Sequence, residues 1–177
     1  AQAGGAQVEG PLSGRTVTVG AKTFTEQFIL ADVLRRALEA EGASVRVRSG
    51  LGSTVAFDAL ASGEIDVYVD YTGTVWATVM NRDDPVSPGE MYAQQQDWLM
   101  EERGVEAFVR LGFENAYAFA TTRETAERLG LDSIADMAGT GASLASDPEF
   151  FGRSEWTRTR DAYGLGDIRT RGMDATF

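Results

Sequence analysis

The chain has 177 residues, of which 43% are hydrophobic, and a formal net charge of −11 at pH 7. This composition supports a folded core, and the negative charge disfavours nucleic acid as a partner. Because histidine and cysteine are absent, Cys/His zinc sites, disulfides and Ser-His-Asp or Cys-His catalytic sites are excluded, and we expect neither enzymatic activity nor a cofactor.

Residues 1–15 are small and polar, and we expect a flexible leader of the kind that follows a removed export signal. From residue 16 the pattern alternates between strand and helix. Residues 16–21 alternate with period two, and the next segment places apolar side chains on one helical face. Thr23 and Glu26 have the spacing of a capping box, and Gly42 marks the end of the helix.

Residues 44–49 are predicted as a second strand and residues 55–63 as a short helix. Residues 65–71 have the clearest strand pattern, with Ile65 and Tyr71 on one face and Asp70 on the other. Tyr71 is therefore predicted to lie at the carboxyl end of a strand.

A helix is predicted around residues 73–80, and Ser87, Pro88 and Glu90 start the next one as cap, first-turn proline and capping-box partner. Residues 105–122 read as a long strand that crosses between two lobes. The second lobe is predicted to continue through segments 124–130 and 133–139, a loop and strand within 142–151, a helix around 155–164 and a final strand at 167–172. The pattern predicts an α/β protein with a hinge near residues 110–115.

Four ordered motifs carry a resemblance to a known family: VGAKTFTEQFILADVL, GLGSTVAFDALASGEIDVYVDYTGT, LGFENAYAF and EFFGR. Over about residues 16–177 the chain resembles the osmoprotectant-binding proteins that capture glycine betaine, carnitine or choline for ABC importers. The resemblance implies the type II periplasmic-binding-protein fold, ABC permease subunits as partners, and an extracytoplasmic location, either periplasmic or anchored at the cell surface.

Members of this family continue past the position of Phe177. We therefore expect a first lobe at 16–111 without its C-terminal return, and an incomplete second lobe at 112–177. Such a chain is expected to bind ligand weakly or not at all, or to recover a cleft by pairing with another chain.

A trimethylammonium group carries charge but has no N–H to donate, so its recognition depends on aromatic ring faces. The resemblance assigns Tyr71 and Tyr117 to such a cage in a crevice between the lobes. Lys22, the sole lysine, and Arg153 are expected to bind the carboxylate of a betaine. The alternatives are that the tyrosines pack in the core and that both basic residues form ordinary surface ion pairs.

Thr74 is expected to offer a hydroxyl to the ligand or to cap the next helix. Asn115 stands where some relatives have an aspartate near the cation, and it is expected to line the site or to act as a turn amide. Trp76 and Trp156 are further candidate aromatics, although tryptophans on helices usually pack in the core. Two rival functions stay open: a ligand-sensing or enzymatic domain on the same fold, and a small-anion receptor that uses GLGST at a helix start.

Overall fold

The structure is a computed structural model that describes residues 9–173. The first eight residues of the predicted leader lie outside this range. The chain divides into two compact units between Gly112 and Phe113. The boundary predicted between the two lobes lies between residues 111 and 112.

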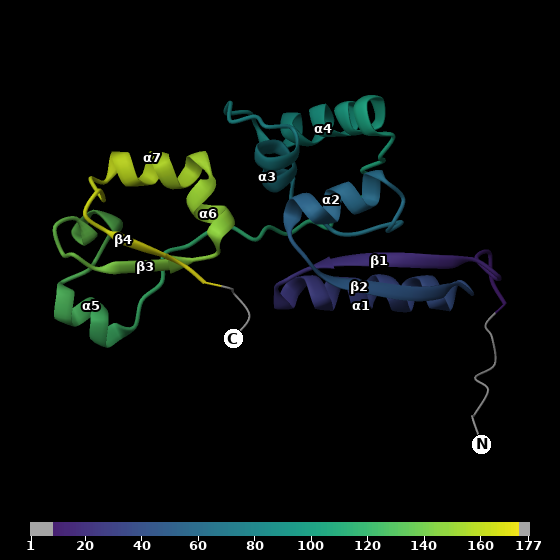
Figure 1. Cartoon of the computed structure of the whole chain (residues 1–177), viewed down its shortest axis with the longest axis horizontal. Helices are drawn as coiled ribbons and strands as arrows, with labels where there is room; N and C mark the ends of the chain where they lie inside the picture. Colours follow the sequence, from purple (N-terminus) through teal and green to yellow (C-terminus); the bar gives the residue numbers. More distant parts are fainter. Residues whose placement is uncertain (1–8, 174–177) are drawn as a thin grey trace, which may run out of the picture. The chain divides into compact units, whose positions relative to one another are not determined.

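The first unit begins with the predicted β-α-β arrangement. Strands β1 (Thr16–Lys22) and β2 (Ser44–Leu51) are parallel, and helix α1 (Thr25–Ala40) connects them and packs along the pair, as Figure 1 shows. Parallel strands need such a crossover helix. Apolar side chains from both element types bury one another in a core that includes Val19, Ala21 and Ala31.

Residues 10–15 form a turn that is bonded to the end of α1. The Leu12 N–H donates to the Glu41 carbonyl at 2.9 Å. A Cβ atom at Gly10 would lie 2.4 Å from the same carbonyl oxygen, so this close approach requires glycine. This part of the predicted leader therefore belongs to the folded unit.

The prediction of a full strand at residues 65–71 is wrong. This segment lies beside β1, but it forms only one isolated parallel bridge, between Val19 and Val67. A regular ladder would pair the Thr18 N–H with a backbone carbonyl, whereas this N–H donates to the side chain of Asp66 at 2.7 Å. The aspartate thus replaces a ladder bond, and the segment runs on without strand geometry.

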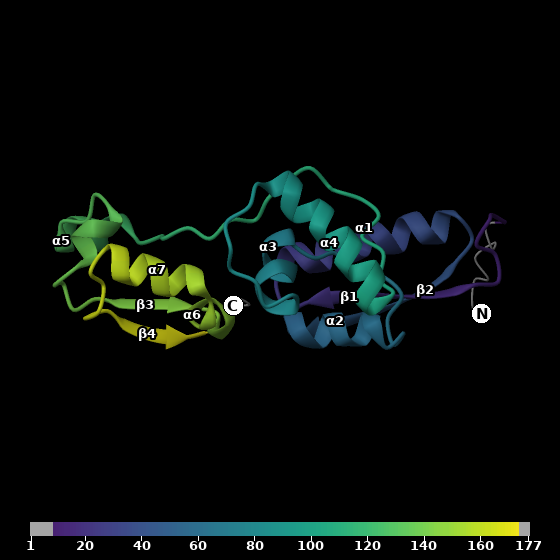
Figure 2. The ribbon, with the colours of Figure 1, turned by 90° about the horizontal axis from the view of Figure 1, so that it is seen from above.

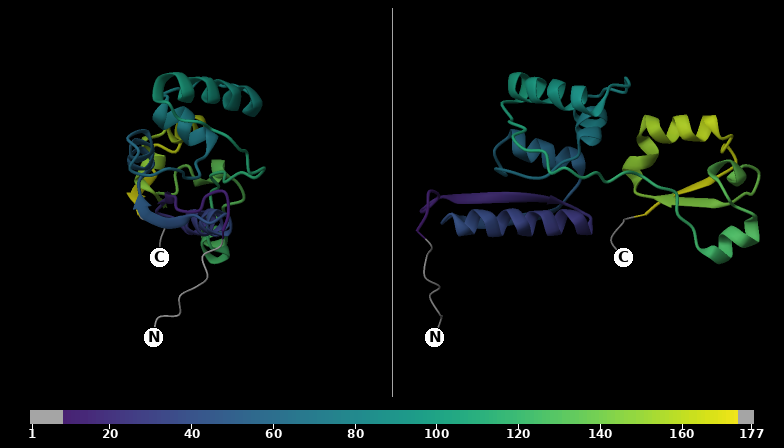
Figure 3. Two further views of the ribbon diagram at one scale, coloured as in Figure 1. Left: turned by 90° about the vertical axis from the view of Figure 1, so that its right-hand side faces the viewer. Right: turned by 180° about the vertical axis from the view of Figure 1, so that it is seen from behind.

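The helices of the first unit follow on the other side of β1 and β2 from α1, as Figures 1 and 3 show. They are α2 (Ser53–Ala61), α3 (Thr72–Thr74), the π-helical turn η1 (Val75–Val79) and α4 (Pro88–Arg103). The predicted start of α4 is confirmed, because Ser87 and Glu90 form a reciprocal capping box and Pro88 occupies the first turn. A small core joins these helices through Phe57, Val75 and Leu99.

Residues 105–122 were predicted as a strand, and this prediction is wrong. The segment has no regular secondary structure and is drawn as a plain trace in Figure 2. A strand needs a neighbour to complete its ladder. In the described part of the chain, the Ala107 carbonyl instead accepts hydrogen bonds from Tyr92 and Gln96 on α4.

The second unit contains a pair of short parallel strands, β3 (Ser143–Ser146) and β4 (Arg169–Gly172). Its helices are α5 (Arg123–Leu129), the 3-10 turn η2 (Ile134–Met137), α6 (Pro148–Gly152) and α7 (Ser154–Ala162). The core of this unit consists of Phe150, Trp156, Leu165 and Ile168. Between residues 9 and 173, no helix combines the length and the apolar character that crossing a bilayer requires.

Candidate ligand-binding site

Lys22 ends β1 in a nearly buried position, where its side chain is 4% exposed. Its ammonium group forms an ion pair with the Asp70 carboxylate and donates to the Ser53 hydroxyl at 3.3 Å. A buried charge is tolerated when it is paired and hydrogen-bonded in this way. The structure therefore places Lys22 inside a polar network rather than in a surface ion pair.

Tyr71 lies next to Lys22, so the structure brings these two predicted ligand residues together. The Lys22 ammonium lies 5.2 Å from the centroid of the Tyr71 ring, within the range of cation–π attraction. The Phe24 ring lies on the same tyrosine, with 6.0 Å between the ring centroids. Tyr71 is partly buried, so its ring is not hidden in the core.

The hydroxyl of Tyr71 is fixed by hydrogen bonds to side chains of α1. It donates a hydrogen bond to the Glu26 carboxylate and accepts one from the Gln27 side chain at 3.3 Å. The predicted capping box of Thr23 and Glu26 is wrong for this reason. The N-cap residue of helix α1 is Phe24, which makes no side-chain capping bond, and the Glu26 carboxylate accepts a hydrogen bond from Tyr71 instead.

Asp70 connects the members of this network. Besides the Lys22 ammonium, it accepts the Tyr71 backbone N–H at 2.8 Å and the Tyr68 hydroxyl at 2.5 Å. Burial, together with the nearby Asp70 charge, raises the pKa of Tyr68 well above its ordinary value. Tyr68 therefore stays a neutral donor at physiological pH.

Thr74 follows this cluster at the end of α3. Its backbone N–H donates to the Tyr71 carbonyl at 2.9 Å, so the turn at residues 71–74 fixes its position relative to the tyrosine. Its hydroxyl does not cap the next helical turn. The capping alternative is therefore wrong, and Thr74 stays a predicted ligand residue.

The second unit brings together the other predicted tyrosine and arginine. The Arg153 guanidinium lies 5.7 Å from the centroid of the Tyr117 ring, and the Phe150 ring lies 4.6 Å from the same centroid. Tyr117 is 53% exposed, whereas Phe150 is buried in the core. The tyrosine thus rests on the core of this unit and presents ring surface to solvent.

Arg153 lies between α6 and α7, and its side chain is 9% exposed. Its guanidinium donates to Glu155 at 2.7 Å and lies 3.8 Å from Glu149. Although burial lowers it, these acidic partners raise the pKa of Arg153 above its ordinary value. Partial burial and the nearby Asp147 carboxylate raise the pKa of Tyr117 to about 12.

The three remaining candidate residues are Asn115, Trp76 and Trp156. Asn115 is exposed, two positions before Tyr117. Trp76 and Trp156 are 3% and 5% exposed, and each lies in the core of its own unit. The tryptophans therefore pack in the interior, as the alternative for helix-borne tryptophans expected.

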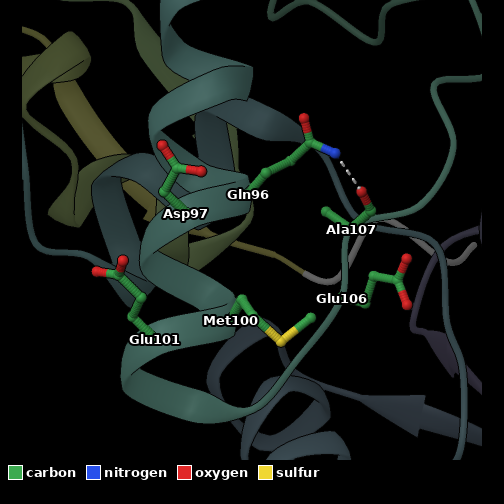
Figure 4. Close-up of a pocket in the computed structure, with 6 residues that line it drawn as sticks. All are labelled: Gln96, Asp97, Met100, Glu101, Glu106 and Ala107. Carbon is green, nitrogen blue, oxygen red and sulfur yellow. Dashed lines mark hydrogen bonds between the residues drawn. The ribbon is translucent and has the colours of Figure 1, made fainter.

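A surface hollow of the first unit lies elsewhere. It measures about 280 Å³ and is formed by α4 and the residues that follow it, as Figure 4 shows. Its lining residues are Gln96, Asp97, Met100, Glu101, Glu106 and Ala107. None of the predicted ligand residues contributes to it, and within residues 9–173 no group of acidic side chains has the geometry of a metal site.

Sequence reasoning missed Asp70 and Glu26, the two carboxylates that hold Lys22 and Tyr71. Asp70 was assigned to the polar face of a strand, and Glu26 to a helix cap. The available signal was the proximity of Asp70 to Tyr71 in the sequence. The pairing with Lys22 spans 48 positions and depends on the fold.

The chain matches the OpuAC family, the substrate-binding domain of ABC-type glycine betaine transport systems, over residues 15–177. A glycine-betaine-binding protein of Pseudomonas aeruginosa is 35% identical over 180 residues, which cover 94% of this chain and 58% of that protein. A carnitine transport binding protein of Listeria monocytogenes is 28% identical, over 72% of this chain and 42% of its own length.

Among solved structures, the crystal structure of a glycine betaine/carnitine/choline ABC transporter protein aligns with a TM-score of 0.59 and 23% identity. The alignment covers 90% of this chain and 61% of that one. This chain thus spans roughly half the length of the proteins it matches, and its α/β fold is that of type II substrate-binding proteins. The chain belongs to the OpuAC family, the substrate-binding domains of ABC-type glycine betaine transport systems.

Proposed function

We propose that this chain captures a small quaternary-ammonium osmolyte of the glycine betaine, carnitine or choline type for an ABC importer, outside the cytoplasm. One observation carries the proposal. In each of the two units, the tyrosine predicted for the cage lies beside the basic residue predicted for the carboxylate, Tyr71 with Lys22 and Tyr117 with Arg153. This pairing suits a molecule in which a methylated cation and a carboxylate lie a few bonds apart.

The tyrosine rings are proposed to bind the cation. A trimethylammonium group cannot donate a hydrogen bond, so the negative face of an aromatic ring is its natural partner. Each ring contributes roughly 0.5–2 kcal/mol when the contact excludes water. Tyr71 is fixed through its hydroxyl and its backbone, and Tyr117 rests on Phe150, so both rings are held before a ligand arrives.

The carboxylate of a betaine is proposed to meet Lys22 and Arg153. The Lys22 ammonium has three donors, and among the described residues Asp70 and Ser53 accept from it. The third donor is proposed to meet the ligand carboxylate. Arg153 has five N–H donors in a planar fork, which suits a carboxylate. Thr74 is proposed to add a hydroxyl, and Asn115 to line the site near the cation.

The relatives support this class of ligand. The two curated proteins described above are named for glycine betaine and for carnitine, and both of these ligands combine a trimethylammonium group with a carboxylate. A permease of the ABC type is the proposed partner, because the family consists of domains from such transport systems.

Calorimetric titration of the purified chain tests the proposal. Glycine betaine, carnitine and choline are compared with sulfate, phosphate and proline, using the wild type, Tyr71→Ala, Tyr117→Ala and the control Tyr163→Ala. Tyr163 is 44% exposed and has no proposed ligand role. Each site variant is expected to weaken betaine binding by roughly 2- to 30-fold, the equivalent of one cation–π contact, while the control leaves it unchanged.

Binding of sulfate or phosphate without binding of any methylated cation would favour the anion-receptor alternative. Sedimentation of the same samples shows whether betaine binding accompanies pairing of two chains. Equal affinities of Tyr71→Ala, Tyr117→Ala and the wild type for betaine would contradict the proposed cage.

A further inference from the structure

We propose that Asp70 is the positioning residue of the ligand site and acts through Lys22, as the counter-ion that holds its ammonium group beside Tyr71. This inference rests on the function proposed above, in which Lys22 meets the ligand carboxylate. Asp70 itself is not proposed to touch the ligand.

The burial of the pair is the first argument. The side chains of Lys22 and Asp70 are 4% and 10% exposed, so the two charges lie almost entirely out of water. A lysine in such a place requires a counter-charge and hydrogen bonds. Asp70 supplies the charge, and Ser53 supplies a further acceptor at 3.3 Å.

The bonds of Asp70 are the second argument. One carboxylate oxygen, Oδ1, accepts both the Lys22 ammonium and the Tyr71 backbone N–H, and the other, Oδ2, accepts the Tyr68 hydroxyl at 2.5 Å. With three donors around it, the carboxylate has a fixed orientation. The same oxygen atom therefore joins the proposed carboxylate-binding lysine to the backbone of the proposed cage tyrosine.

The surrounding charges are the third argument. The polar groups of the described residues that bond to this cluster include the Glu26 carboxylate on the Tyr71 hydroxyl, the neutral side chain of Gln27 and the neutral hydroxyls of Ser53 and Tyr68. Between residues 9 and 173, the carboxylate that contacts the Lys22 ammonium is that of Asp70. Removing its charge thus leaves the ammonium without its ion-pair partner.

Two variants separate the charge of Asp70 from its shape. Asp70→Asn keeps the size of the side chain and an oxygen that can accept the Tyr71 N–H, but it removes the charge. Asp70→Glu keeps the charge on a longer side chain. If Asp70 acts as the counter-ion, betaine affinity falls about tenfold or more in Asp70→Asn and is partly restored in Asp70→Glu. A purely structural role predicts the opposite order, because the asparagine fits the site better.

Lysine-selective isotope labelling provides a second measurement. Lys22 is the only lysine of the chain, so its ammonium group gives one side-chain signal in the NMR spectrum. Hydrogen exchange of this group is expected to accelerate about tenfold in Asp70→Asn, because the ion-pair bond no longer protects it. The control Glu64→Gln removes the acidic partner of the exposed ion pair with Arg48 and is expected to leave the lysine signal and the affinity unchanged.

A double variant tests the route through Lys22 and covers the case in which Asp70→Asn does not fold. Lys22→Met/Asp70→Asn removes both charges of the buried pair, and it is expected to bind betaine as weakly as Lys22→Met alone. A further loss of about tenfold in the double variant would show that Asp70 does not act through Lys22, and would overturn the inference.

The outcomes distinguish this inference from the function on which it rests. If the wild type binds betaine and Asp70→Asn binds it equally well, the inference is wrong and the proposed function stands. If the wild type binds none of the methylated cations, the proposed function fails and the inference fails with it.

Discussion

The hydroxyl of Tyr71 donates a hydrogen bond to the carboxylate of Glu26, which lies in the first turn of α1. An acidic residue in that turn is also favoured by the helix dipole. The same carboxylate thus favours the start of the helix and fixes the ring of a proposed cage residue. Tyr71 is in this way attached to α1 by its hydroxyl and to Asp70 by its backbone.

Tyr71→Phe is predicted to lower the stability of the fold while leaving betaine affinity nearly unchanged. The variant loses the bond to Glu26, and the free energy of unfolding is expected to fall by about 0.5–1.5 kcal/mol. Its ring face remains, so betaine affinity should stay within about threefold of the wild type. Urea unfolding and calorimetric titration check the two values, and loss of all betaine binding in Tyr71→Phe would contradict a cage based on ring faces.

Betaine affinity is predicted to be nearly constant between about pH 5 and 8. The chain contains no histidine, the side chain that ordinarily titrates in this window. The pKa of Tyr117 is raised to about 12, so its hydroxyl keeps its proton throughout the window. Titrations at several pH values check this, and a steep change in affinity within the window would point to a site built from other groups.

The ion pair of Arg153 and Glu155 is predicted to make the second unit sensitive to acid. The hydrogen bond from Arg153 lowers the pKa of Glu155 below its ordinary value of 4.5. The pair therefore stabilises the fold at pH values above the ordinary pKa of Glu155. Its contribution disappears as the pH falls through the lower pKa that Glu155 has in the folded chain. Because Glu155 is 46% exposed, the expected contribution is about 1 kcal/mol or less.

Glu155→Gln is expected to lower stability at pH 7 and to reduce the loss of stability between about pH 5 and 3. Unfolding followed at the indole N–H signal of Trp156 reports on this unit. Glu127→Gln on α5 is the matched control and should retain the wild-type acid response. A Glu155→Gln curve parallel to that of the wild type would show that the pair does not contribute.

Phe150→Ala is predicted to unfold the second unit selectively. Phe150 is buried against Trp156 and supports the Tyr117 ring, and truncation of a core phenylalanine costs about 3–5 kcal/mol. A core this small does not have much stability to lose. The indole signal of Trp156 should lose its native position while those of Trp76 and Trp98 keep theirs, and the exposed control Phe113→Ala should change none of them.

Local sequence patterns predicted the elements that depend on nearby residues. The β1-α1-β2 unit follows from a change in hydrophobic period, and the start of α4 follows from a cap, a proline and a capping-box glutamate within four positions. The assignment of Tyr71 and Tyr117 to a cage rests on the family resemblance of the motifs that contain them, and it stays a prediction. The structure adds that each tyrosine lies beside a basic residue that was also named.

Side-chain bonds between distant residues account for most errors. The strand pattern at residues 65–71 is strong, but the Asp66 side chain replaces one ladder bond with β1. At the last residue of β1, the backbone N–H of Lys22 donates to the Gln27 side chain at 3.3 Å. Alternation of polar and apolar residues does not report such bonds, so the sequence indicated a strand where the chain forms only a bridge.

The central claim is that the methyl groups of the ligand contact the rings of Tyr71 and Tyr117. Saturation-transfer NMR of the chain with glycine betaine tests it most directly, because the equivalent N-methyl protons give one signal and weak binding is sufficient. Irradiation of the aromatic protons is predicted to reduce this methyl signal in the wild type and in Tyr163→Ala, and much less in Tyr71→Ala and Tyr117→Ala. Transfer of equal strength in all four proteins, or no transfer in any of them, would contradict the account.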